Sequence, residues 1–170
     1  MAIDKKMEAA FNDQINKEYY SEYLYKAMKA RFSEMNLNGF VNWFNIQEQE
    51  ERAHAEGMYD YVLERGGQIE LGAIDKPEIK GTTPVEIFKQ VLEHEQYVTS
   101  RINALADVAD EVKDRAALIF LNWYIKEQVE EEASASDVLA KVERLGDDVT
   151  ALLDLDKELA ARVFNPPIIK

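Results

Sequence analysis

The 170-residue sequence contains no cysteine, which narrows the chemistry available to the protein. Disulfide frameworks, cysteine-ligated zinc, rubredoxin-type iron sites and thiol catalysis are excluded, and the composition fits a reducing compartment. Glycine and proline are also scarce, at seven and four residues, and most lie within 66–84 and 166–167. Because so few helix-breaking residues occur, long and uninterrupted helices are expected.

Basic residues are outnumbered, with 20 Lys and Arg against 33 Asp and Glu, and the net charge is −13. This balance argues against nucleic acid as a partner, because phosphate binding needs a basic patch. The clearest apolar run, residues 116–125, is too short to span a bilayer, and residues 1–11 lack the apolar core of a signal peptide. We therefore expect a cytoplasmic protein that does not enter the membrane, folded as one domain over residues 1–170.

Apolar residues recur at spacings of three and four along the chain without sustained alternation, which predicts an all-α fold. Four long helices are expected at 4–34, 39–65, 84–111 and 114–145, and a short fifth helix runs from Asp147 or Asp148 to about Arg162. The third helix has the best-marked start, since Thr83, Pro84 and Glu86 supply an N-cap, a proline at the first helical position and a capping-box glutamate.

The break between the third and fourth helices is weakly marked, because residues 110–114 contain no glycine or proline. One continuous helix of about 60 residues would be roughly 90 Å long, which a globule of this size could not cover. Two helices are therefore expected here. Residues 67–83 form a long connection between the second and third helices.

Each long helix carries polar residues near the middle of its apolar stripe. These are, in chain order, Glu18, Glu51 with His54, Glu95, and Gln128 with Glu131. Antiparallel pairing across the two short connections, together with the long crossover, would bring these positions to one level of the core. A single such residue usually lies at an edge and reaches towards water. Four carboxylates at one level would instead repel one another, so two divalent cations are the better explanation.

Carboxylates and one imidazole suit iron or manganese and, less selectively, zinc, with iron as the natural choice. Glu51-x-x-His54, with glutamates on other helices, matches the pattern of ferritin-like di-iron proteins. The sequence resembles the non-haem ferritins of bacteria and archaea over essentially its whole length. The resemblance is carried by "NDQINKEYYSEYLY" (12–25), "WFNIQEQEERAHA" (43–55), "EHEQYVT" (93–99) and "FLNWYIKEQVEEE" (120–132).

This resemblance implies a ferritin-like four-helix bundle with a long crossover and a short fifth C-terminal helix. It further implies an iron-storage ferritin that oxidises Fe(II) with dioxygen or peroxide at a di-iron ferroxidase centre inside each subunit. Fe(III) would then form a mineral core within a hollow homo-oligomeric shell of twenty-four subunits. The implied ligands of one iron are Glu18, Glu51 and His54, and those of the other are Glu95 and Glu131, with Glu51 bridging.

The resemblance assigns further residues around this pair. Gln128 would lie close to the dioxygen side, and a third iron would bind Glu50, Glu127 and Glu130. Tyr25 matches a tyrosine found near the ferroxidase iron, although its spacing is equally typical of a core residue.

Some residues differ from the motifs of related di-iron families, and others are not expected to bind metal. Gln128-x-x-Glu131 replaces the second Glu-x-x-His of symmetric di-iron oxidases and bacterioferritins. Arg52 stands where bacterioferritins have their haem-binding methionine, so no haem is expected. His94 points about 100° away from Glu95 on a helix and is not expected to be a ligand. Met28, Met58, Trp43 and Trp123 are interpreted as packing residues, the tryptophans alternatively as subunit contacts.

Three alternatives stay open at this point. A rubrerythrin-like di-iron peroxidase would need a second Glu-x-x-His and usually a cysteine-rich segment. A Dps-like mini-ferritin builds its site between subunits and lacks the fifth helix. A metal-free helical interaction bundle would place the same glutamates at its edges.

Overall fold

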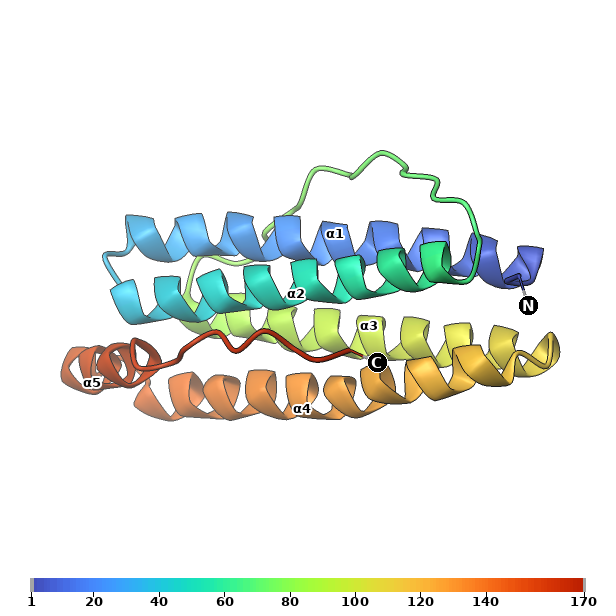
Figure 1. Cartoon of the computed structure of the whole chain (residues 1–170). Helices are drawn as coiled ribbons and strands as arrows, with labels where there is room; N and C mark the ends of the chain where they lie inside the picture. Colours follow the sequence, from blue (N-terminus) through green and yellow to red (C-terminus); the bar gives the residue numbers. More distant parts are fainter. Residues whose placement is uncertain (1, 170) are drawn as a thin grey trace.

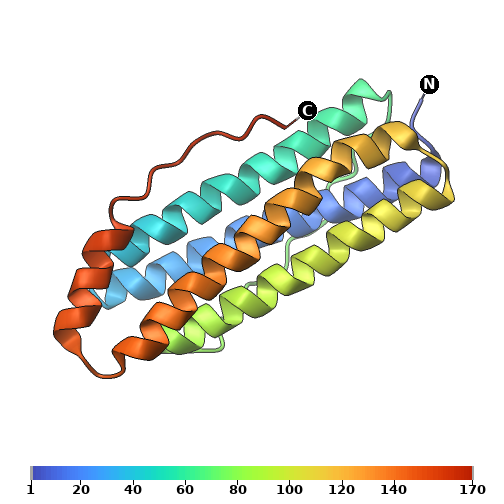
Figure 2. The same cartoon turned by 90° about the horizontal axis from the view of Figure 1, so that it is seen from below.

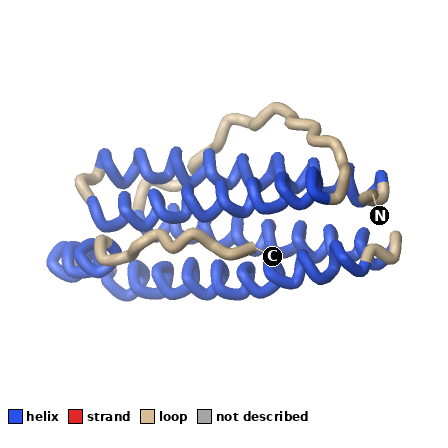
Figure 3. The backbone as a smooth tube through the Cα atoms, viewed as in Figure 1, coloured by secondary structure: helices blue, strands red, loops and turns tan. Residues whose placement is uncertain are grey.

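The computed structural model describes residues 2–169, which form five helices (Figure 1). The helices are α1 (Lys5–Glu34), α2 (Asn38–Glu64), α3 (Pro84–Glu111), α4 (Arg115–Leu145) and α5 (Val149–Leu159). Residues 2–169 contain no strand (Figure 3), so the predicted all-α class is confirmed. Over the same residues, no helix combines the length and apolar character needed to cross a membrane.

The four long helices form a bundle of two antiparallel pairs, α1 with α2 and α3 with α4 (Figure 1). The long connection between α2 and α3 runs over the outside of α1. It returns the chain to the other end of the bundle, where α3 begins. Helix α5 crosses one end of the bundle, and the chain then returns beside α2 (Figure 2). The predicted ferritin-like arrangement, including the short fifth helix, is therefore confirmed.

Local sequence signals set most helix ends. At α3, Thr83 Oγ1 accepts the Glu86 N–H at 3.3 Å, while Glu86 Oε2 accepts the Thr83 N–H at 3.1 Å, which is the expected capping box. The break before α4 is also confirmed. Lys113 adopts a positive φ of 59°, and Asp114 Oδ1 accepts the Ala117 N–H at 3.0 Å to cap the new helix.

One predicted boundary is wrong: α5 ends at Leu159 and does not reach Arg162. Asn42 on α2 explains the early end, because its Nδ2 donates to the carbonyl oxygens of Leu159 at 3.2 Å and of Arg162 at 2.9 Å. The Leu159 carbonyl also accepts the Arg162 N–H at 3.3 Å, so the chain leaves α5 through a turn that Asn42 holds against α2.

The apolar core consists of two clusters separated along the bundle axis. One cluster, towards the α5 end, contains Phe32, Phe44 and Phe88, together with the buried Met28 and Trp43. The other contains residues from the opposite halves of the same helices, among them Phe11, Met58 and Leu121. On every long helix the polar positions predicted above fall between the two clusters. The bundle therefore contains one polar layer between two apolar ones.

Candidate metal centre

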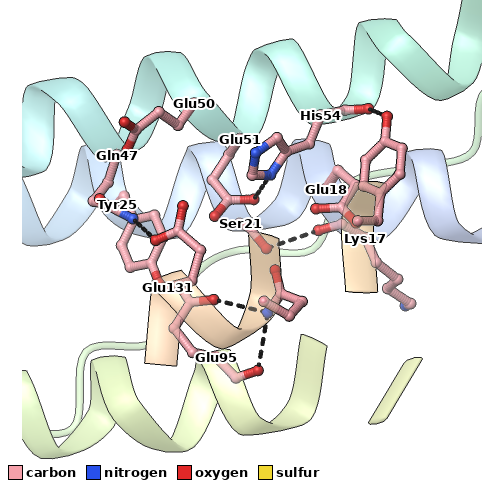
Figure 4. A network of polar contacts seen from close by, with 12 residues as sticks. Lys17, Glu18, Ser21, Tyr25, Gln47, Glu50, Glu51, His54, Glu95 and Glu131 are labelled. Carbon is pink, nitrogen blue, oxygen red and sulfur yellow. Dashed lines mark hydrogen bonds and ion pairs between the residues drawn. The ribbon is translucent and has the colours of Figure 1, made fainter. Parts of the chain in front are cut away.

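The polar layer brings together the six predicted inward-facing residues, each at most 5% exposed. They are Glu18 from α1, Glu51 and His54 from α2, Glu95 from α3, and Gln128 and Glu131 from α4. Figure 4 shows four of the labelled carboxylates, those of Glu18, Glu51, Glu95 and Glu131, approaching one another from the surrounding helices. Helical periodicity explains the convergence, since each residue continues the buried stripe of its own helix.

One part of this layer could hold a cation directly. Glu18, Glu51 and His54 each offer a ligand atom, and the three atoms lie within 4.8 Å of one another. Among the described residues, Glu18 Oε2, Glu51 Oε2 and His54 Nε2 have no hydrogen-bond partner although they are buried. Buried polar atoms are rarely left unpaired, because each costs about 1–3 kcal/mol. A bound cation would give such atoms their missing partner.

A second potential group shares His54 with the first and adds Glu127 and Glu131, again within 4.8 Å. Glu95 belongs to neither group, and both of its oxygens accept hydrogen bonds from side chains of the layer. The Tyr25 hydroxyl donates to Glu95 Oε1, and Gln128 Nε2 donates to Glu95 Oε2 at 3.3 Å. Tyr25 and Gln128 therefore both lie directly on the predicted centre.

The electrostatics of the layer favour a bound cation or protons. Burial, reinforced by the charges of Glu95 and Glu18, raises the pKa of Glu51 well above its ordinary value. Burial and the neighbouring Glu131 raise the pKa of Glu95 to about 8, despite the hydrogen bonds from Tyr25 and Gln128. The pKa of Tyr25 is also raised, by burial and then by Glu95, so its phenol stays protonated. Metal ligation would displace the extra protons.

Three residues not assigned from the sequence hold the predicted ligands in place. Gln14 Nε2 donates to Glu18 Oε1 at 2.7 Å, and Gln47 Nε2 donates to Glu131 Oε2 at 2.9 Å. Tyr124 donates from its hydroxyl to the His54 carbonyl oxygen at 2.8 Å. A sequence signal existed for the glutamines, because each precedes a predicted ligand by four residues on the same helical face.

The residues predicted to bind a third iron differ from one another in burial and in their contacts. Glu50 forms an ion pair with Arg162 at 2.7 Å. Burial raises the pKa of Glu50 to about 7, although the positive charge of Arg162 acts to lower it. Glu127 is partly buried and near His54, whereas Glu130 is exposed. Within residues 2–169, the three do not form one group with ligand atoms in mutual reach. Their joint role therefore stays a prediction.

Other singled-out residues lie outside the polar layer. His94 Nε2 is 2.8 Å from Ser21 Oγ, and burial lowers its pKa to about 4. Arg52 is exposed and donates from Nε to Glu22 Oε1 at 3.0 Å. Trp123 packs edge-on against the His54 ring, with the ring centroids 5.5 Å apart.

A four-helix bundle that holds carboxylates and a histidine in its core has the architecture of the ferritin-like di-iron carboxylate proteins. Comparison with known proteins narrows this class. The family model "Ferritin-like domain" matches residues 8–145. The "Bacterial non-heme ferritin" of Staphylococcus aureus is 40% identical over 163 residues, covering 96% of this chain and 98% of the relative.

Solved structures agree with this assignment. An Archaeoglobus fulgidus ferritin engineered to a closed form is 48% identical with a TM-score of 0.94, covering 96% of this chain and 100% of that one. A humanized archaeal ferritin is 50% identical with a TM-score of 0.95, covering 97% and 100% respectively. The chain therefore belongs to the ferritin family of iron-storage proteins.

Proposed function

We propose that the protein oxidises Fe(II) to Fe(III) at a di-iron centre inside each subunit and stores the product as a mineral. The observation that carries this proposal is the set of buried ligand atoms on Glu18, Glu51 and His54 that have no hydrogen-bond partner among the described residues. Carboxylate oxygens and an imidazole nitrogen form a donor set that fits iron. Oxidation of two Fe(II) ions releases two electrons, which reduce dioxygen to hydrogen peroxide or peroxide to water.

In this proposal Glu18, Glu51 and His54 bind one substrate iron, while Glu95 and Glu131 bind the other. Glu51 bridges the two positions. Its pKa supports that role, because the charges of both Glu95 and Glu18 raise it, and these two residues belong to opposite halves of the centre. Hydrogen bonds from Gln14 and Gln47 orient the carboxylates of Glu18 and Glu131 before iron arrives.

Gln128 and Tyr25 act on Glu95. Both donate hydrogen bonds to its carboxylate, which holds the group in position and stabilises its charged form. The protonated Tyr25 phenol keeps a donor beside the site where dioxygen or peroxide would react. Gln128 is proposed to lie close to the dioxygen side, and its further hydrogen bond to the Glu95 backbone carbonyl at 3.3 Å fixes its amide beside Glu95.

Glu50, Glu127 and Glu130 form an outer, exchangeable iron position on the path away from the pair. Three carboxylates without an imidazole should bind iron more weakly than the pair does. Replacing all three with alanine should spare the first oxidation event and change the iron stoichiometry or turnover. Loss of the initial burst would instead assign these residues to the primary centre.

The decisive test of the pair is Glu51→Ala, followed by stopped-flow absorbance of Fe(III) formation. Loss of fast oxidation with retained helical circular dichroism is expected, because one substitution removes a ligand from both irons. Glu64→Ala, an exposed position on the same helix, is the control. Oxidation at the wild-type rate in Glu51→Ala would refute the di-iron assignment.

A shell of twenty-four copies of this 19.5 kDa chain would have a mass of about 470 kDa (24 × 19.5). Analytical ultracentrifugation separates such a particle from a monomer or a dimer. A cytoplasmic location is part of the same proposal, and cell fractionation tests it.

A further inference from the structure

The C-terminal segment, residues 160–169, lies along α2 and is fixed there by several contacts (Figure 2). Asp156 Oδ1 accepts the Gly39 N–H at 2.7 Å, so α5 caps the start of α2. A Cβ atom at Gly39 would lie 1.6 Å from the Asp156 carbonyl oxygen, which shows how closely the two helices approach. Asn42 then holds the Arg162 carbonyl at 2.9 Å. The backbone position of Arg162 is therefore determined by α2.

The Arg162 guanidinium makes two directional contacts with the side chains that flank the centre. It donates from Nη1 to Gln47 Oε1 at 2.6 Å and from Nη2 to Glu50 Oε2 at 2.7 Å. It also lies over the Trp43 ring, 5.2 Å from the centroid. The Gln47 amide cannot reverse without losing a bond, because its Nε2 donates to Glu131 at 2.9 Å (Figure 4).

We propose that Arg162 is the resident cation of the outer carboxylates, and that it lowers their metal affinity while positioning Glu131 through Gln47. This inference rests on the proposed di-iron centre and its outer iron position. The ion pair between Arg162 Nη2 and Glu50 Oε2 at 2.7 Å supports it, because it places a positive charge directly on one carboxylate of the outer position. Without the guanidinium, the Glu50 carboxylate would lose this positive neighbour, and the outer position would attract a divalent ion more strongly.

The effect on outer affinity needs only a positive charge, whereas the paired contacts with Gln47 and Glu50 require an arginine. A guanidinium has several N–H donors in one rigid plane, so it can bind an amide oxygen and a carboxylate together. A lysine at this position would supply the charge but not the fixed pair of contacts. As a consequence, iron can pass through the outer position without being retained there. At the neighbouring di-iron centre, the Glu131 ligand is already oriented through Gln47.

The test is calorimetric titration of iron-free, full-length protein with Zn(II), which is inert to redox change. In Arg162→Gln, Zn(II) binding at the outer position should strengthen by at least about tenfold, because a positive charge beside the site is removed. In Arg162→Lys the outer affinity should stay close to that of the wild type. Lys157→Gln makes the same charge change at an exposed site on α5 and should have no effect.

Two further variants separate the charge from a purely structural role of the segment. Ile169 packs at the far end, where it occupies the space left by Gly57, so Ile169→Ala loosens the segment and leaves Arg162 in place. This variant should bind Zn(II) like the wild type. In a Glu50→Gln background, adding Arg162→Gln should no longer strengthen outer binding, because the shared carboxylate is gone.

The proposal is overturned if Arg162→Gln leaves outer binding unchanged, or if Lys157→Gln or Ile169→Ala strengthens it equally. Failure of the underlying di-iron proposal would look different. In that case wild-type protein would lack two tight Zn(II) sites per subunit, whatever residue stands at position 162.

Discussion

Replacing Glu51 with glutamine should stabilise the metal-free protein and remove most of the stability that metal binding adds. Glu51 is 1% exposed, and one of its oxygens has no hydrogen-bond partner among the described residues. Burial and the charges of Glu95 and Glu18 raise its pKa, so the folded protein disfavours the ionised form. Glutamine has nearly the same shape and carries no charge, so this penalty disappears.

The three atoms on Glu18, Glu51 and His54 without a hydrogen-bond partner among the described residues set an upper bound on the effect, and mass action by the bound metal sets its expected size. At about 1–3 kcal/mol each, they represent on the order of 3–9 kcal/mol that ligation could relieve. Zn(II) at a hundred times its dissociation constant stabilises the folded state by about 2.7 kcal/mol. A domain of this size gains about 2–4 °C in melting temperature per kcal/mol, so wild-type protein should gain roughly 5–11 °C.

Differential scanning calorimetry can measure both parts of this prediction, first after chelation and then with Zn(II). Glu51→Gln should melt above the wild type when metal-free and gain less than half of the wild-type shift with Zn(II). Glu64→Gln, exposed on the same helix, should behave like the wild type in both states. A full Zn(II) shift in Glu51→Gln, or a lower metal-free melting temperature than wild type, would refute the reasoning.

Three other predictions concern the centre and its support. Metal-free protein should lose stability to urea as the pH rises from 4.5 to about 8, since Glu95 has its ordinary pKa of 4.5 when unfolded and a pKa of about 8 when folded. The contribution of Glu95 to stability is thus complete below pH 4.5 and lost by about pH 8. If Glu95→Gln showed the same dependence of stability on pH as the wild type, this explanation would be wrong. Tyr25→Phe removes a hydrogen bond to Glu95 and should slow Fe(II) oxidation several-fold in stopped flow without lowering helix content; an unchanged rate would argue against its role. Gly39→Ala should destabilise the protein by about 1–3 kcal/mol in thermal melting, because the added carbon overlaps Asp156, whereas Gly72→Ala, with ordinary contacts, should not.

Helical periodicity explains why so much of the fold was predictable. The stripe on each long helix identified the inward face, and the capping box at Thr83 fixed the start of α3. The break at Lys113 needed a size argument, but its local signal was Asp114, a residue suited to cap the following helix. The end of α5 could not be predicted in this way, because Asn42, far away in the sequence, determines it.

The same distinction applies to the centre. Residues on the buried stripes, such as Glu51 and Glu131, were identifiable because one helical period places them in the core. Arg162 follows the last helix, where no periodicity applies, and its contact with Glu50 depends on how α5 crosses the end of the bundle. Sequence periodicity therefore identifies the groups that face the two proposed irons. The charge at the outer carboxylates depends instead on tertiary contacts made by a segment without regular structure, so its role could be inferred only from the folded chain.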